Sequence, residues 1–494
     1  MSDNSNKLGS VAYHNPGSDY FEKRGLKRYA GVWSLWALGV GAVISGDFFG
    51  WNFGIPAGGF GGLLIATIII AVMYIGMAYS LAELSPALPH TGGAYSFGRT
   101  AMGPWGGFVT GLAENMEYVL TPAVIVVGIA SYMSSISMSL FGFDLPQWAW
   151  WAIFYVIFVG MNIWGIELTF RFTVFITIVA LAILLIFWVG AIPLFSWDLA
   201  LNVPASEGHS TFLPFGWAGV AVNLPFAIWF FLAIEQLPLA AEESHSPERD
   251  MPKGLIFGIA TLVVAAFLTL FLNAGISPGA AEIGKSSEPL FAAFKTIFGD
   301  GVGASLLALA AVAGLVASFH TIIFAYGRNI YSLSRAGYFP HWLSVTHGTR
   351  KTPHVALIAG AVLGFIVCLI LQNSAELFGD IPVGAVLLNM AVFGAVIAYV
   401  LQMVSFIILR SKLPNIPRPY VSIFGIPGAA IAAIIAAGTL IALFANPDYR
   451  VGIYGVAAWY VAGLLYFALY GRRKLVYSPE EEFAVKHILE SKST

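Results

Sequence analysis

Residues 31–56, GVWSLWALGVGAVISGDFFGWNFGIP, decide the fold, because this apolar run is long enough to cross a membrane and carries an acid at its centre. A spanning helix needs about 20 apolar residues, and a central charge costs about 2.5–3.5 kcal/mol on insertion scales. Each glycine near the acid weakens the helix by about 1 kcal/mol relative to alanine. Close helix packing would explain the glycines but not Asp47. We therefore predict a helix interrupted at residues 44–48, with Ser45, Gly46 and Asp47 at a binding site.

The composition of the whole chain is that of a membrane protein. Of its 494 residues, 58% are hydrophobic and 10% are charged, whereas soluble domains carry about 25% charged residues. This excludes a soluble enzyme, a nucleic-acid binder and a disordered scaffold. Cys368 is the only cysteine, so we expect no disulfide framework and no cysteine-based metal site. The sequence offers no nucleophile–base pair and no metal-ligand cluster, so we expect neither an enzyme nor a cofactor.

Twelve membrane spans are predicted, near residues 31–56, 60–84, 105–137, 147–164, 169–193, 216–240, 253–277, 302–333, 353–373, 383–409, 420–444 and 450–470. An even number of spans places both termini on one side. That side carries all 24 Lys and Arg residues except Lys285, Lys295 and Arg450. Since cytoplasmic loops are enriched in Lys and Arg, we expect a multi-pass protein of the cell inner (plasma) membrane, embedded in the lipid bilayer. Its cytoplasmic tails would be residues 1–30 and 471–494.

The sixth predicted span, residues 216–240, contains a second break. Glu235 lies inside the span, and Pro238 removes a backbone hydrogen bond three residues later. Breaks at corresponding places in two halves of a chain indicate an inverted-repeat transporter with its site at the membrane midplane. Trp229 and Phe231 flank this break. Aromatic residues often only fill a membrane core, but beside an acid they are suited to wall a cationic ligand.

The third predicted span carries two acids on one helical face. Glu114 and Glu117 are three residues apart, so their side chains lie on the same side of the helix, next to Tyr118. Two carboxylates this close repel each other, and one of them can hold a proton at neutral pH. An interhelical hydrogen bond without a ligand role is the alternative. We assign Glu114, Glu117 and Tyr118 to the substrate site.

Polar groups in the eighth predicted span are candidates for ion coupling. Ser318 and Thr321 carry hydroxyls that could coordinate a cation, and His320 could relay a proton. A structural hydrogen bond to a neighbouring helix is an equally good explanation for each. Outside this group, Glu167 and Arg171 have the i, i+4 spacing of a helical ion pair.

Several stretches resemble the amino acid–polyamine–organocation (APC) superfamily of permeases. The resemblance is carried by ELSPALPHTGGAYSFG at 83–98, FLAIEQLPLAAEESHSPERDMP at 231–252 and YGRNIYSLSRAGYFP at 326–340. Within the superfamily the chain is most similar to ethanolamine permeases, through VISGDFFGWNFG at 43–54 and AENMEYVLTPAV at 113–124. The resemblance extends over nearly the whole chain.

This resemblance implies an all-α polytopic fold with 12 transmembrane helices in a LeuT-like 5+5 inverted repeat. Residues 31–193 would form the first repeat, residues 216–409 the second, and residues 420–470 the two appended helices. Helices 1 and 6 would be broken, with the substrate held at the breaks and transported by alternating access. The chain departs from the family pattern at Ala233, where relatives carry a glycine two residues before the glutamate.

Asp47 indicates the charge of the substrate. Amino-acid carriers of this fold bind a carboxylate at a half-helix N-terminus, where free N–H groups favour an anion. An aspartate there would repel a carboxylate and attract an ammonium, by about 4 kcal/mol at about 4 Å and an effective dielectric of about 20. Together with Glu235 and the acids of the third span, it favours a small cationic amine. Ethanolamine fits, because its hydroxyl could bind Ser45, Tyr118 or a backbone group.

Other functions remain open from the sequence. An amino-acid permease of the same fold, for a neutral or a cationic amino acid, is the first alternative. A non-transporting membrane sensor or subunit is a remote one, since no signalling domain is visible. Proton-coupled uptake is favoured for the driving ion, and sodium coupling stays open.

Overall fold

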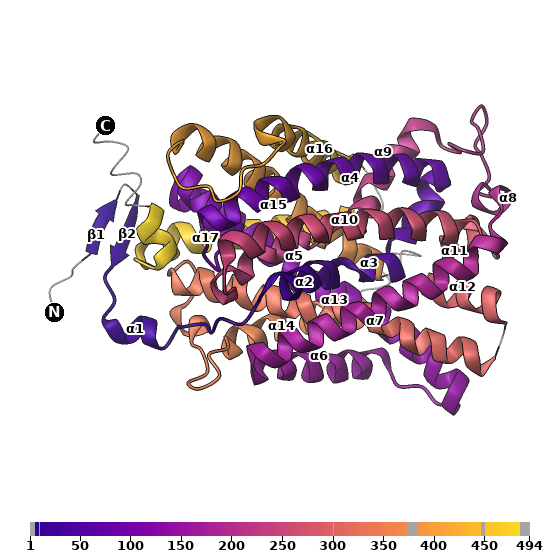
Figure 1. Cartoon of the computed structure of the whole chain (residues 1–494), viewed down its shortest axis with the longest axis horizontal. Coiled ribbons are helices and arrows are strands. Elements are labelled where there is room, and N and C mark those ends of the chain that lie inside the picture. The colour runs from indigo at the N-terminus through magenta and orange to yellow at the C-terminus, as the bar shows by residue number, and fades with distance from the viewer. Residues whose placement is uncertain (1–4, 9, 300, 374–382, 446–449, 485–494) are drawn as a thin grey trace.

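The computed structural model describes residues 5–8, 10–299, 301–373, 383–445 and 450–484, so the ends of the two predicted tails, 1–4 and 485–494, lie outside the described residues (Figure 1). The first five predicted spans correspond to α2 (Val32–Val43) with α3 (Ser45–Phe48), α4 (Ile55–Ala87), α5 (Ala94–Phe141), α6 (Gln147–Trp164) and α7 (Ile166–Ala191). The next five correspond to α9 (Gly216–Ile228) with η3 (Ile234–Glu243), α10 (Pro247–Ala274), α13 (Val302–Arg335), α14 (His354–Asn373) and α15 (Val383–Lys412). The last two are α16 (Gly425–Ala445) and α17 (Arg450–Leu469).

The helices form an all-α membrane bundle, as predicted. Within the described residues, nine helices are long and apolar enough to cross a membrane by length and composition. Spans 1 and 6 consist of shorter pieces, and α6 coincides with the predicted span 147–164. Helix α5 packs against both α15 and α13, which places the third span at the centre of the bundle.

The bundle has two distinct ends in Figure 1, and the N- and C-terminal segments lie together at one of them, which we call the terminal end. The opposite end, which we call the distal end, carries α8 (Trp197–Ala200), α11 (Ala280–Ile283) and α12 (Pro289–Phe298). Short 3-10 turns η2 (Ile192–Leu194) and η4 (His341–Ser344) follow α7 and α13.

The break in span 1 lies beyond the predicted residues 44–48. Asp47 stays helical, because its N–H donates to the carbonyl of Ile44 at 3.0 Å. The chain then becomes extended at Phe49 and turns at Gly50, whose φ of 101° only glycine adopts without strain, before the 3-10 helix η1 (Trp51–Gly54). The prediction was therefore correct about the interruption but placed it a few residues early.

The break in span 6 lies between the end of α9 at Ile228 and the start of η3 at Ile234. Ala233 closes it with a φ of 82°, in the left-handed region. A Cβ atom makes this conformation unfavourable by about 1–2 kcal/mol, which glycine avoids. The structure thus explains why a glycine at this position would suit the fold.

We expect Ala233→Gly to raise the free energy of unfolding by about 1 kcal/mol, because the strain at this residue disappears. The measurement is the thermal transition of the purified protein in detergent. Ala180→Gly is the matched control: Ala180 is buried inside α7, where the same change should cost about 1 kcal/mol. A lower transition temperature for both variants would contradict the expectation.

A small sheet joins the two termini, which the sequence did not predict. Strand β2 (Val11–His14) pairs antiparallel with β1 (Ser5–Leu8) and parallel with β3 (Leu475–Val476). The helix α1 (Ser18–Glu22) follows the first two strands, and the turn η7 (Gly471–Arg473) precedes the third. The strands are two to four residues long, too short for an alternating pattern to identify them.

Candidate functional site

The two broken helices cross in direct contact. A Cβ atom added to Gly46 would lie 2.2 Å from the carbonyl oxygen of Trp229, and one added to Gly50 would lie 2.6 Å from its indole nitrogen. Only glycine permits this approach. The side chains of Trp51 and Phe230 stack beside the crossing with ring centroids 5.5 Å apart. The predicted site residues of spans 1 and 6 therefore meet in the bundle interior.

Two acids from different helices face each other near this crossing. The carboxyl groups of Glu117 on α5 and Glu235 on η3 lie within hydrogen-bonding range of each other. Glu117 also accepts a hydrogen bond from the hydroxyl of Tyr399 at 3.2 Å, and Tyr399 in turn accepts one from Tyr74 at 2.9 Å. By distance and angle, neither carboxylate oxygen of Glu235 has a hydrogen-bond donor within the described structure, although the Tyr399 hydroxyl lies nearby. Two buried carboxyl groups in contact need a shared proton or a cation between them.

The third acid of this group is held by polar side chains. Glu114 accepts hydrogen bonds from the Tyr118 hydroxyl and from the Asn329 amide, both at 3.3 Å. Asn115 donates to the Asn329 oxygen at 3.1 Å, which orients that amide. Glu114 also interacts electrostatically with Glu235. We call Glu114, Glu117 and Glu235 the glutamate cluster; all three side chains are buried.

Phe231 lies beside the glutamate cluster. Its ring centroid is 5.4 Å from that of Tyr74, the tyrosine that donates to Tyr399. Phe231 is fully buried, and Trp229 is 2% exposed. The indole N–H of Trp229 has no acceptor among the described residues. The two aromatic residues predicted for the site thus lie within the break, just before the 3-10 helix η3 that carries Glu235.

Asp47 lies apart from the glutamate cluster. Its side chain is fully buried, and neither carboxylate oxygen has a hydrogen-bond partner by distance and angle in the described structure. Its polar neighbour is the Thr269 hydroxyl on α10, which accepts a hydrogen bond from Trp188 at 3.2 Å. Asp47 therefore has a different polar neighbour from the three coupled glutamates, where the sequence suggested one group of acids.

Span 8 contacts the break in span 1 through hydroxyl groups. The backbone N–H of Ser45 donates to the Ser318 hydroxyl at 2.9 Å, and this hydroxyl donates to the carbonyl of Gly41 at 2.8 Å. The Thr321 hydroxyl bonds carbonyls of its own helix. Ser318 thus ties α13 to the turn that carries Asp47, which keeps it a candidate for ion coupling.

His320 contacts residues of α6 and α7. Its ring lies 3.1 Å from the Asn162 amide and 3.4 Å from the carbonyl of Thr169. It packs edge-on against Phe158 and Phe172, with centroid distances of 5.9 and 5.0 Å. The His320 side chain, which projects from α13, therefore packs against α6 and α7 and hydrogen-bonds to both.

Hydrogen bonds and an ion pair join separate elements at both ends of the bundle. At the distal end, Asn52 donates to the carbonyls of Ile283 and Ser286, each at 2.8 Å. At the terminal end, Arg328 forms a fully buried ion pair with Glu243 at 2.8 Å. Backbone N–H groups of residues 29 and 30 donate to the Glu243 carbonyl.

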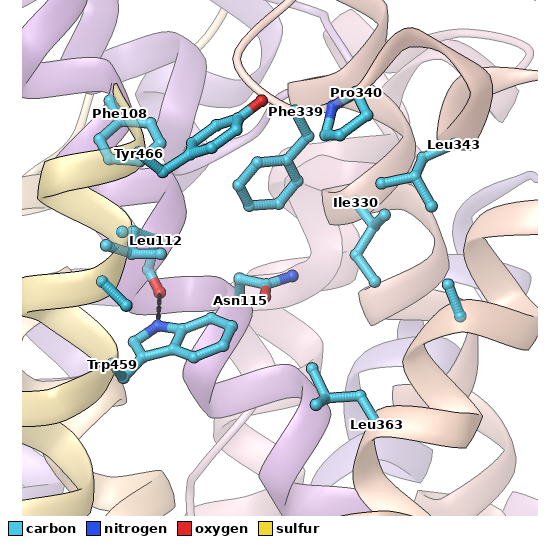
Figure 2. A pocket seen from close by; sticks show the side chains of 13 residues that line it. Phe108, Leu112, Asn115, Ile330, Phe339, Pro340, Leu343, Leu363, Trp459 and Tyr466 are labelled. Atoms are coloured by element: carbon cyan, nitrogen blue, oxygen red, sulfur yellow. Dashed lines mark hydrogen bonds between the residues drawn. The ribbon is translucent and has the colours of Figure 1, made fainter. Parts of the chain in front are cut away.

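An apolar pocket of about 350 Å³ lies outside the glutamate cluster, between α5, α13, α14 and α17 (Figure 2). Its walls include Leu363 and Trp459, and the indole of Trp459 donates to the carbonyl of Leu112 at 3.2 Å. Asn115 lines it as well, while its amide bonds Asn329. Such walls suit apolar chains and not a small cation, so we do not place the substrate there.

The sequence did not single out Tyr74, Tyr399 and Asn329. The structure adds them to the site, because they supply hydroxyl and amide groups to the glutamate cluster. A tyrosine or an asparagine is a weak signal, since many such residues sit in membrane helices for packing. Their positions depend on tertiary packing, in which α13 and α15 contact α5 and α4 contacts α15.

Paired broken helices around buried polar groups define a membrane transporter of the broken-helix type. The chain belongs to the amino acid permease family, because its residues 31–469 match the sequence model of that family. This supports membership of the APC superfamily and a role as a transporter rather than an enzyme.

Three relatives illustrate the range of this family. An uncharacterized transporter of Rhizobium meliloti (strain 1021) is 28% identical over 450 residues, covering 90% of this chain and 92% of the relative. The methylthioribose transporter of Bacillus subtilis (strain 168) is 25% identical, with 92% and 95% coverage. The branched-chain amino acid permease of the same organism is 27% identical, with 91% and 94% coverage.

Proposed function

We propose that this protein takes up a small organic cation, with ethanolamine as the preferred substrate, by alternating access. Residues 31–193 and 216–409 would act as inverted repeats around the two breaks. The terminal end would face the cytoplasm, in agreement with the distribution of Lys and Arg along the chain. The membrane would be the cell inner membrane.

One observation carries the proposal: the glutamate cluster is buried without a basic partner. None of the ion pairs formed by the described residues includes Asp47, Glu114, Glu117 or Glu235. Buried acids are ordinarily paired or protonated, because an isolated buried charge is strongly unfavourable. A substrate ammonium that lies between Glu117 and Glu235 would supply the missing charge.

The hydroxyl groups around the cluster support a substrate that is itself a hydroxyl-bearing amine. The Tyr399 hydroxyl donates a hydrogen bond to Glu117, and the Tyr118 hydroxyl donates one to Glu114. Each hydroxyl can both donate and accept. Ethanolamine has an ammonium for the carboxylates and a hydroxyl for one of these groups. It has no carboxylate that the acids would repel.

An amino-acid permease is the second candidate, favoured by the branched-chain amino acid permease among the relatives. The methylthioribose transporter in the same family carries a sugar derivative, so family membership alone does not decide the substrate. A cationic amino acid could place its charged side chain beside the acids. A neutral amino acid would require all four acidic side chains to be protonated, or would have to bind away from them.

Counterflow in proteoliposomes tests the proposal. We expect labelled ethanolamine to exchange, unlabelled ethanolamine to compete best, choline more weakly, and alanine and arginine little. Varying pH and sodium separately identifies the coupling ion. Tight binding of alanine in a thermal-shift assay, with no binding of ethanolamine, would refute the assignment and favour the amino-acid alternative.

A further inference from the structure

The acidic segment near the C-terminus is docked into the terminal end of the bundle. Residues 479–484 form a short helix after β3. The side chains of Glu480 and Glu481 are both fully buried, although adjacent acids in a polar tail ordinarily lie in water. We call residues 478–484 the C-terminal segment. Its burial needs an explanation, because the transport site does not use it.

Glu481 occupies a site built from three separate parts of the chain. Its carboxylate accepts from the Arg99 guanidinium at 2.5 Å and from the hydroxyls of Tyr13 at 2.5 Å, Tyr338 at 2.9 Å and Tyr95 at 3.0 Å. Four donors meet the full acceptor capacity of a carboxylate. The buried guanidinium and the acid compensate each other, which an uncharged side chain at position 481 could not do.

Glu480 extends this contact to span 6. Its carboxylate binds Arg335, at the end of α13, at 2.5 Å and accepts from Ser332 at 3.2 Å. Arg335 also binds Glu242, next to the last residue of η3, at 2.5 Å. One guanidinium therefore joins the C-terminal segment, span 8 and span 6 in a single network.

The N-terminal strands hold the segment from the other side. Tyr13, which donates to Glu481, lies on β2 and pairs in register with Leu475 of β3. Its ring stacks on Tyr477 with centroids 4.6 Å apart. The two chain ends thus act as one unit across the terminal end of the bundle.

We propose that the C-terminal segment is a latch that holds the terminal end of the transport path closed and must undock before that end opens. Opening there requires η3 to separate from α13, and Arg335 binds both η3 and the latch. Undocking removes one of the two acids that fix Arg335 and removes the partner of Arg99. This inference rests only on the chain being a transporter and not on the identity of its substrate.

The test measures how readily a buried position of η3 becomes accessible. Ala241 on η3 is 1% exposed, and the only natural cysteine, Cys368, is buried. In a Cys368→Ala background, Ala241→Cys reports opening through its reaction with a charged maleimide in nanodiscs. We expect Glu480→Gln/Glu481→Gln to speed this reaction by about tenfold, because the glutamine oxygens still accept hydrogen bonds but lack the charge that strengthens those from Arg335 and Arg99.

Glu482→Gln is the matched control, since Glu482 is exposed and adjacent to Glu481; its labelling rate should not change. If the double variant fails to fold, Tyr338→Phe removes one donor to Glu481 and should speed labelling by about two- to threefold. A folded latch variant that labels at the control rate would overturn the proposal. The measurement needs no substrate, so its outcome is independent of the ethanolamine assignment.

Discussion

Glu235→Gln lowers the uptake of ethanolamine by about 100-fold or more in proteoliposomes, while the protein stays folded. The change keeps the size of the side chain but removes one charge from the pair with Glu117. A charge pair at about 4 Å is worth about 4 kcal/mol at an effective dielectric of about 20, and desolvation of the amine offsets part of this. The net free energy that remains corresponds to a change of about 100-fold in the rate of uptake.

The thermal transition separates this role from a structural one. By distance and angle, neither oxygen of Glu235 accepts a hydrogen bond within the described residues. The amide oxygen of a glutamine could still accept from the nearby Tyr399 hydroxyl, so we expect an unchanged or higher transition temperature. Glu248→Gln is the control, because Glu248 is exposed at the start of α10. Wild-type uptake by Glu235→Gln would remove the glutamate cluster from the substrate site and favour a neutral substrate.

For Asp47→Asn, the second large effect, we expect uptake of the amine to fall by about 100-fold, because this change removes the only charged side chain of span 1. The thermal transition should stay the same or rise, since an asparagine is less costly to bury than an unpaired carboxylate. A fall in uptake together with a rise in thermal stability would show that Asp47 serves function at the expense of stability.

Asp198→Asn provides the matched control, because Asp198 is exposed in α8 at the distal end. Thr269→Val tests the environment of Asp47, since it removes the hydroxyl beside the carboxylate. A moderate loss of uptake, smaller than that of Asp47→Asn, would agree with a positioning role for Thr269. Retained transport by Asp47→Asn would show that the glutamate cluster acts without it.

Much of the fold was predictable because a bilayer leaves few choices for an apolar chain. Each predicted span corresponds to helical structure, and the predicted pair of Glu167 and Arg171 is confirmed at 2.7 Å. The break in span 1 was placed early, since helix-weakening residues near Asp47 do not reveal where the turn occurs. Gly50 decides this, because its positive φ lets the chain change direction.

The sequence predicted acids inside the bundle, and all four are buried, but it did not predict how they are grouped. Glu114, Glu117 and Glu235 converge, whereas Asp47 faces Thr269, and His320 bonds Asn162 and Thr169. The direction in which a side chain points depends on the rotation of each helix about its axis. A sequence without an alignment carries little information about that rotation.

Sequence alone determined that this chain is a membrane bundle with two interrupted helices and acids inside it, because hydrophobic length and the cost of buried charge are local properties. Tertiary structure alone decided which acids lie together, which tyrosines hydrogen-bond to them, and that Glu480 and Glu481 are buried at the terminal end of the bundle. These depend on contacts between residues hundreds of positions apart, such as Glu481 with Arg99. Packing sets such contacts, and no local pattern in the chain encodes them.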